Sequence, residues 1–371
     1  MGRWKDQELL LWAGVLLLGA ALLRWPEESV SAMRDGLQLC GGVMVPALFP
    51  FFVLASLVVG SGLARRMGGL LEPVMRPLFR VNGSCAAVLA LGLVGGYPVG
   101  ARTAVQLYRE GQCSRAEAER LLSFCNNCGP AFLLGAVGTG IFGSVQVGLL
   151  LWAVHGAAAL LVGLLFRFYG SEETVDAPKV AGPSARVPHA ALLTQAVSDG
   201  VRSALNLCGF LLFFAVVLRL LTVSGVLTAG ADLLVRLPPH LSPRLARQLL
   251  TGFVELSSGV AAMTEGPVTE RLLLAAFLVG WGGVSVHGQA LAFLADSGLS
   301  LLPYFLGKLL HGLLSVLLLA GAMRWLPLEL PVSVSPAVPT ALRGMAVHGA
   351  ASALWLGGFF LLLAALAGKK Q

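Results

Sequence analysis

The stretch SFCNNCGPAF, residues 123–132, decides the fold because it puts two amides and a Gly-Pro pair inside a strongly apolar chain. By hydropathy this stretch lies at membrane depth, where a polar side chain without a partner is costly. Pro130 cannot donate to the helical hydrogen-bond ladder, and Gly129 weakens the helix before it. The stretch therefore predicts a membrane helix that breaks near its middle, with Asn126 and Asn127 at the break.

The composition around this stretch is that of a membrane protein. Of the 371 residues, 56% are hydrophobic and only 12% are charged, and the mean hydropathy is +0.81. Soluble globular proteins carry about 25% charged residues. We therefore expect an all-α polytopic membrane protein with about eight transmembrane helices, each needing about 20 apolar residues. The lipid bilayer is its first expected partner, and its oligomeric state is open.

Charge and cysteine content exclude several classes of function. The net charge is +7, but the basic residues lie singly or in pairs at segment ends, as topology determinants do. Because no basic block is interleaved with aromatic residues, nucleic-acid binding is excluded. Cys125 and Cys128 form a C-x-x-C motif without the second pair that a zinc site needs. They are interpreted as packing residues, and we expect no metal and no cofactor.

The chain divides into five expected regions. Residues 1–36 hold an N-terminal helix and an interfacial segment, and a polar linker at 170–189 separates two units of similar size at 37–169 and 190–325. Residues 326–371 hold a C-terminal helix. An arginine-bearing helix is expected to lie on the membrane surface at 64–81. The expected spans are 7–24, 38–63, 146–168, 204–228, 302–325 and 344–367.

The two units repeat the same pattern. Each has an interrupted hairpin, 84–111 with GGYPVG in the first unit and 249–270 with VELSSG in the second. In each unit a broken helix follows, at SFCNNCGPAF in the first and at GWGGVSVHGQA, residues 280–290, in the second. Such breaks at membrane depth are tolerated only against protein or a wet cavity, so the hairpins are expected to be re-entrant. Three crossings per unit predict an inverted repeat, an architecture of secondary transporters.

Broken helices expose backbone groups and half-helix ends that can hold a polar substrate. The candidate substrate-binding residues therefore come from both hairpins and both breaks: Gly96, Tyr97, Pro98, Gly100, Arg102, Asn126, Asn127, Glu255, Ser257, Ser258, Gly283, Ser285, His287 and Gln289.

Several of these side chains have more than one open role. Glu255 can bind a coupling proton or cation, bind the substrate, or pair structurally with Arg102. Arg102 can meet an anionic substrate group or face the cytoplasm. His287 can handle substrate or protons, or pack against a helix. One lysine and three histidines are expected to pack within the protein or to lie at the membrane interface: Lys308, His155, His311 and His348.

An enzyme is not expected. The chain has no H-E-x-x-H, no G-x-S-x-G, no Walker loop and no G-x-G-x-x-G after a strand. The remaining acidic residues are scattered without a second acid at a spacing that would make a catalytic pair.

The motifs together resemble the YlbJ (SpoVV) family of sporulation integral membrane proteins, which carry nucleoside-recognition Gate domains. The resemblance covers about 40–325 and rests on GYP-x-G at 96–100, S-F-x-N-N at 123–127, FVELSSGV at 253–260 and GG-x-S-V-x-x-Q at 282–289. It implies a transporter of dipicolinic acid in the outer forespore membrane of a spore-forming bacterium. It also implies a plan similar to that of concentrative nucleoside transporters. The two cysteines beside the Asn pair depart from the family motif.

For the site, the resemblance implies hydrogen bonds to the two carboxylates of dipicolinate from the amides and serines, with charge from Arg102. Glu255 would repel this dianion unless it were protonated or paired with a cation. Transport of a nucleoside or another small organic anion stays open as an alternative. So does a non-transporting membrane scaffold in the spore envelope.

Overall fold

The computed structural model describes residues 2–170, 189–236 and 241–325, and every regular element within them is a helix. The predicted C-terminal helix, with His348, and nearly all of the predicted linker lie outside the described residues. Four described helices are long and apolar enough to cross a membrane, or five if one bent pair is a single span. The chain is therefore an all-helical, multi-pass membrane protein. The expected number of about eight spans stays a prediction.

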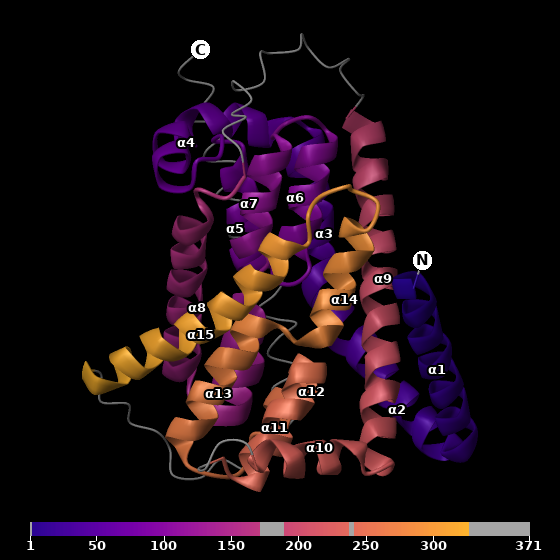
Figure 1. The fold of residues 1–371 in the computed structure, drawn as a ribbon. Coiled ribbons are helices and arrows are strands. Elements are labelled where there is room, and N and C mark those ends of the chain that lie inside the picture. Colours follow the sequence, from indigo (N-terminus) through magenta and orange to yellow (C-terminus); the bar gives the residue numbers. More distant parts are fainter. Residues whose placement is uncertain (1, 171–188, 237–240, 326–371) are drawn as a thin grey trace.

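The N-terminal part forms two helices on the outside of the bundle. These are α1 (Gly2–Arg24) and α2 (Pro26–Leu39), and both lie beside the long helix α9 (His189–Val223) (Figure 1). Pro26 occupies the first turn of α2, where its missing N–H costs nothing, and two glutamates follow it. Glu28 forms a salt bridge with Arg219 of α9, with 2.7 Å between Oε2 and Nε.

The arginine-bearing helix of the first unit forms as predicted. A π-helical turn (Cys40–Met44) leads into α3 (Val45–Gly60), and the chain then bends by 80° into α4 (Leu63–Phe79). Gly62 makes this bend with a positive φ of 73°, which glycine adopts without steric cost. Figure 1 shows α4 at the upper end of the molecule.

The rest of the first unit contains both predicted interruptions. The hairpin consists of α5 (Cys85–Gly95) and α6 (Val99–Arg109), and the broken helix of α7 (Arg115–Phe124) and a π-helical segment (Ala131–Ile141), followed by α8 (Val145–Phe166). Ser114 caps α7 in a reciprocal capping box with Glu117, which fixes where this helix begins. We call the non-helical residues 125–129 the first break.

The second unit follows the same order of elements. After α9 come α10 (Val226–Val235), α11 (Pro243–Val254), α12 (Leu256–Ala261), α13 (Val268–Trp281), α14 (Gly283–Leu294) and α15 (Leu302–Trp325). We call Gly282, between α13 and α14, the second break. One predicted boundary was wrong, because α9 begins at His189 rather than near residue 204. The polar residues of this segment lie on a continuous helix, since no proline interrupts it.

The two hairpins lie in opposite halves of the bundle. Figure 1 shows α5 and α6 in the upper half and α11 and α12 in the lower half, with α8, α9 and α15 beside them. Among the described residues, the two larger buried apolar clusters are centred on α3 to α7 and on α8, α12 and α13, and a third, small one joins α2 to α9. The two larger clusters meet near the middle of the molecule, where Tyr97 and Cys128 belong to the second cluster. The hairpin tips and breaks are therefore brought together at the centre.

Candidate functional site

The first break obtains its hydrogen bonds from helices distant in the sequence. The amide N–H of Cys128 donates to Nε2 of His155 on α8 at 2.9 Å. The ammonium of Lys308 on α15 donates to the carbonyl oxygen of Asn126 at 3.0 Å. Backbone groups at a helix end have no partner within the helix. Side chains from α8 and α15 therefore hold this segment in its non-helical form.

The two amides of the first break are fully buried. Nδ2 of Asn127 donates to the carbonyl of Phe124 at 2.9 Å, which closes the end of α7. Nδ2 of Asn126 donates to the hydroxyl of Tyr304 on α15 at 3.3 Å. Within the described residues, the Oδ1 atoms of both amides have no hydrogen-bond partner. Buried polar atoms without partners are rare in folded proteins, so these two acceptors mark a candidate functional region.

The second break is bound to the first hairpin by a tyrosine. Because α13 ends at Trp281, the carbonyl of Val279 lacks its normal helical partner. The hydroxyl of Tyr97, at the tip of the first hairpin, donates to this carbonyl. Beyond the break, Nδ1 of His287 lies 3.1 Å from the same Tyr304 hydroxyl that Asn126 contacts. Tyr97 and Tyr304 thus connect the two units at the breaks.

The tip of the second hairpin carries a carboxylate. Glu255 is the residue between α11 and α12, and its two oxygens accept from the amide N–H groups of Ser257 at 3.0 Å and Ser258 at 2.7 Å. It is not paired with Arg102, whose guanidinium donates instead to the carbonyl of Phe52 and the hydroxyl of Ser56 on α3. Arg102 therefore anchors α6 to α3 and does not face the cytoplasm, because it is buried.

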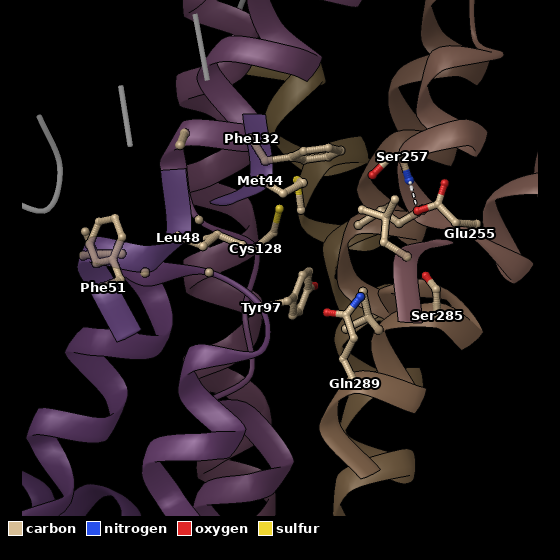
Figure 2. Close-up of a pocket in the computed structure, with 18 residues that line it drawn as sticks. Met44, Leu48, Phe51, Tyr97, Cys128, Phe132, Glu255, Ser257, Ser285 and Gln289 are labelled. Carbon is tan, nitrogen blue, oxygen red and sulfur yellow. Dashed lines mark hydrogen bonds between the residues drawn. The ribbon is translucent and has the colours of Figure 1, made fainter. Parts of the chain in front are cut away.

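A pocket with a volume of about 70 Å³ lies between these elements (Figure 2). In Figure 2, Tyr97 and Cys128 lie on one side, and Ser257, Glu255, Ser285 and Gln289 lie on the other. The lining comes from the first hairpin, the first break, the second hairpin and α14, with apolar walls from α3 and α9. Six predicted site residues line this pocket: Gly96, Tyr97, Glu255, Ser257, Ser285 and Gln289.

The other predicted site residues lie outside the lining: Pro98, Gly100, Arg102, Asn126, Asn127, Ser258, Gly283 and His287. Two of them are glycines at close backbone contacts. A Cβ on Gly100 would lie 1.9 Å from the carbonyl oxygen of Cys125, and one on Gly283 would lie 3.1 Å from the carbonyl oxygen of Gly252. These glycines let each helix pack directly on the opposing backbone.

The sequence reasoning missed the polar face of α15. Lys308 was expected near the membrane interface, but it is fully buried at the centre. Tyr304, Lys308, His311 and Ser315 are all buried and follow each other at intervals of four, three and four residues. That spacing places them on one face of a helix. A polar stripe on an otherwise apolar helix was the signal that pointed to the protein interior.

Chemically, the pocket suits a small polar molecule with a flat apolar body. Its hydrogen-bonding groups are one carboxylate, one amide and three hydroxyls, and the hydroxyl of Ser285 is buried without a partner in the described structure. Aromatic rings and aliphatic side chains form the remaining walls: Met44, Leu48, Phe51, Phe132, Leu211 and Val286. A lining of few polar groups among apolar walls is typical of small-molecule sites.

Comparison with known proteins places the chain in a family. A family model described as nucleoside recognition, Gate, matches residues 42–145. The sporulation integral membrane protein YlbJ of Bacillus subtilis (strain 168) is 36% identical over 349 residues, which cover 87% of this chain and 84% of that protein. No solved structure matches the chain. The chain therefore belongs to the YlbJ family of sporulation integral membrane proteins.

Proposed function

We propose that this protein is a secondary transporter that carries a small organic anion, dipicolinate, across the outer forespore membrane during sporulation. The observation that carries the proposal is the position of the pocket, between the tips of the two hairpins, the first break and α14, the helix that begins at the second break. Paired discontinuous helices in corresponding positions of two halves are the usual location of a transport site.

The repeated order of elements supports an inverted repeat of about eight spans with two re-entrant hairpins. The elements from α3 to α8 recur in kind from α9 to α15, and the two hairpins lie in opposite halves of the bundle (Figure 1). In such a plan, small rotations of one unit against the other expose a central site first to one side and then to the other. Tyr97, which bonds across to Val279, would break and re-form its contact during that motion.

The chemistry of the lining supports a planar carboxylate as substrate. Dipicolinate is a pyridine ring with two carboxylates, and the ring can pack against Tyr97 and Phe132. Gln289 and Ser285 offer donors to a carboxylate. Glu255 opposes an anion, but two backbone N–H groups share its charge. It is also the position where a coupling proton or cation would offset the repulsion.

A nucleoside is the alternative substrate that one observation favours, because the matching family model is described as nucleoside recognition. A nucleoside is also a flat ring with hydrogen-bonding substituents, but it carries no charge. A membrane scaffold that transports nothing would not need a buried pocket between paired breaks.

Uptake by reconstituted protein tests the proposal. The full chain is inserted into liposomes, and uptake of labelled dipicolinate is compared with uptake of labelled uridine. We expect dipicolinate uptake, and we expect Gln289→Ala to reduce it about tenfold through loss of a charge-assisted hydrogen bond. Gln195→Ala, an exposed amide on α9 away from the pocket, is the matched control and should leave uptake unchanged.

Three outcomes are informative. Uridine uptake without dipicolinate uptake would replace the substrate, and no uptake of either would favour a scaffold. Equal rates for Gln289→Ala and Gln195→Ala would move the transport site away from this pocket.

A further inference from the structure

Lys308 is a buried cation at the point where the two units meet. Its ammonium is fully buried and donates to the hydroxyl of Tyr97 at 3.2 Å and to the carbonyl of Asn126 at 3.0 Å. Tyr97 in turn donates to the carbonyl of Val279. Lys308 therefore donates a hydrogen bond to the first break directly and is linked to the second break through Tyr97.

The charge of Lys308 has no protein counter-ion among the described residues. None of the salt bridges found there includes it, and its hydrogen-bond partners are a carbonyl and a phenol. Burying an ammonium group without an opposite charge is costly. A neutral donor would satisfy the same carbonyl and the same hydroxyl at a lower cost. The hydrogen bonds alone therefore do not account for a lysine at this position.

The pocket lacks the charge that Lys308 carries. The residues that line it include one carboxylate, Glu255, and no cation. The other buried cation near the first hairpin, Arg102, is bound to α3 outside the lining. Lys308 lies behind the Tyr97 wall of the pocket, because its ammonium is 4.7 Å from the centre of the Tyr97 ring and Tyr97 lines the pocket (Figure 2). In an apolar interior, a charge acts over such a distance with little screening.

We propose that Lys308 makes the pocket selective for anions, by supplying the positive charge that a carboxylate substrate meets through the Tyr97 wall. This inference rests on the proposed transport function and names the residue that sets its charge preference. The relation is reciprocal, because an anion in the pocket also offsets the cost of the buried ammonium. Lys308 acts through Tyr97 and is therefore a positioning and selectivity residue rather than a direct substrate contact.

The test is a charge series of ligands with one shape. Binding of dipicolinate, of the monoanion 6-carbamoylpicolinate and of the neutral pyridine-2,6-dicarboxamide is measured on the full chain in nanodiscs. In the unchanged protein, affinity should rise with each negative charge. Lys308→Gln should lower dipicolinate affinity about tenfold and change that of the diamide less than about twofold, whereas Lys308→Arg should keep most of the preference. Arg324→Gln, an exposed cation on the same helix, is the control for general loss of charge.

Each outcome decides the inference. Equal losses for the anion and the neutral diamide would show that Lys308 has only a structural role. If Lys308→Gln does not fold, the charge series on the unchanged protein decides alone, and equal affinity for all three ligands overturns the inference. Failure of the unchanged protein to bind or move any pyridine carboxylate would instead overturn the proposed function. Binding by the unchanged protein with an unaltered charge preference in Lys308→Gln would overturn the inference only.

Discussion

The two helix breaks beside the pocket are stabilised in different ways. The first break spans residues 125–129, and its backbone groups bond to His155 and Lys308 from two distant helices. The second break is a single residue, because α14 begins at Gly283 directly after Gly282. Its turn depends on the positive φ of 92° at Gly282. The first break therefore depends on side chains of other helices, and the second on the conformational freedom of glycine.

This difference shows that the two units are not equivalent at the site. In the wide first break, several backbone groups have no partner within a helix, and two buried amide side chains lie beside them. This break can change shape if its side-chain partners move. The narrow break fixes the direction of α14 and so the positions of Ser285 and Gln289 in the lining. The proposed transport function therefore predicts motion at the first break, while the second break fixes its half of the pocket.

The largest effect is expected where α6 packs on the first break. A Cβ on Gly100 would lie 1.9 Å from the carbonyl oxygen and 2.6 Å from the carbonyl carbon of Cys125, and neither backbone atom can rotate away. Gly100→Val should therefore lower the free energy of unfolding by about 3 kcal/mol or more. Thermal unfolding in detergent measures this loss as a lower Tm.

The control is Gly209→Val, because Gly209 lies on α9 with no atom within 4 Å of its ideal Cβ. It should unfold at nearly the temperature of the unchanged protein. If the two variants were equally stable, the close packing of α6 on the first break would not contribute to stability.

A smaller loss is expected for His155. Replacing it with Ala leaves the buried N–H of Cys128 without an acceptor, which should lower the free energy of unfolding by about 2 kcal/mol. His155→Gln keeps an acceptor at a similar distance from the backbone and should recover part of the loss. Thermal unfolding of the two variants compares them directly, and equal Tm values would mean that the volume of the ring, rather than its acceptor, supports the break.

The sequence was informative about where the helices break. Gly-Pro and Gly-Gly pairs predicted interruptions near Gly96, Gly129 and Gly282, and the structure places ends of helices at all three. Local chemistry was sufficient there, because proline and glycine disrupt a helix in any surroundings.

The partners of the breaks were not predictable in the same way. Lys308 bonds to a carbonyl that is 182 residues away in sequence, and Arg102 bonds to a serine 46 residues away. The polar stripe of α15 indicated its inward face, but the sequence did not show which backbone group Lys308 would meet, and Lys308 was assigned to the interface. The apolar pocket walls, such as Leu211 of α9, have the composition of ordinary core residues. Tertiary packing alone distinguishes them.

An intermediate effect is expected for the thiols of the first break. Cys128 lines the pocket, whereas Cys125 is buried outside the lining. In a variant that keeps Cys128 as its only cysteine, dipicolinate at about ten times its Kd should slow modification by a small methanethiosulfonate about tenfold. A variant that keeps only Cys125 is the control and should show no such protection. Unchanged labelling of Cys128 at saturating substrate would contradict the position of the site.

The smallest effect is expected at the second break, where the requirement is conformational rather than steric. The atoms nearest an ideal Cβ on Gly282 belong to side chains, the closest being a methyl group of Val286 at 3.3 Å, so a small shift of that side chain makes room for it. Gly282→Ala should therefore lower the free energy of unfolding by about 1 kcal/mol, because alanine is strained in the left-handed conformation. Gly282→Asn should lower it less, because Asn tolerates that conformation better. Thermal unfolding of both variants measures the difference. A higher Tm for Ala than for Asn would show that contacts, and not the positive φ, limit this position, and the contrast between the two breaks would then be one of packing alone.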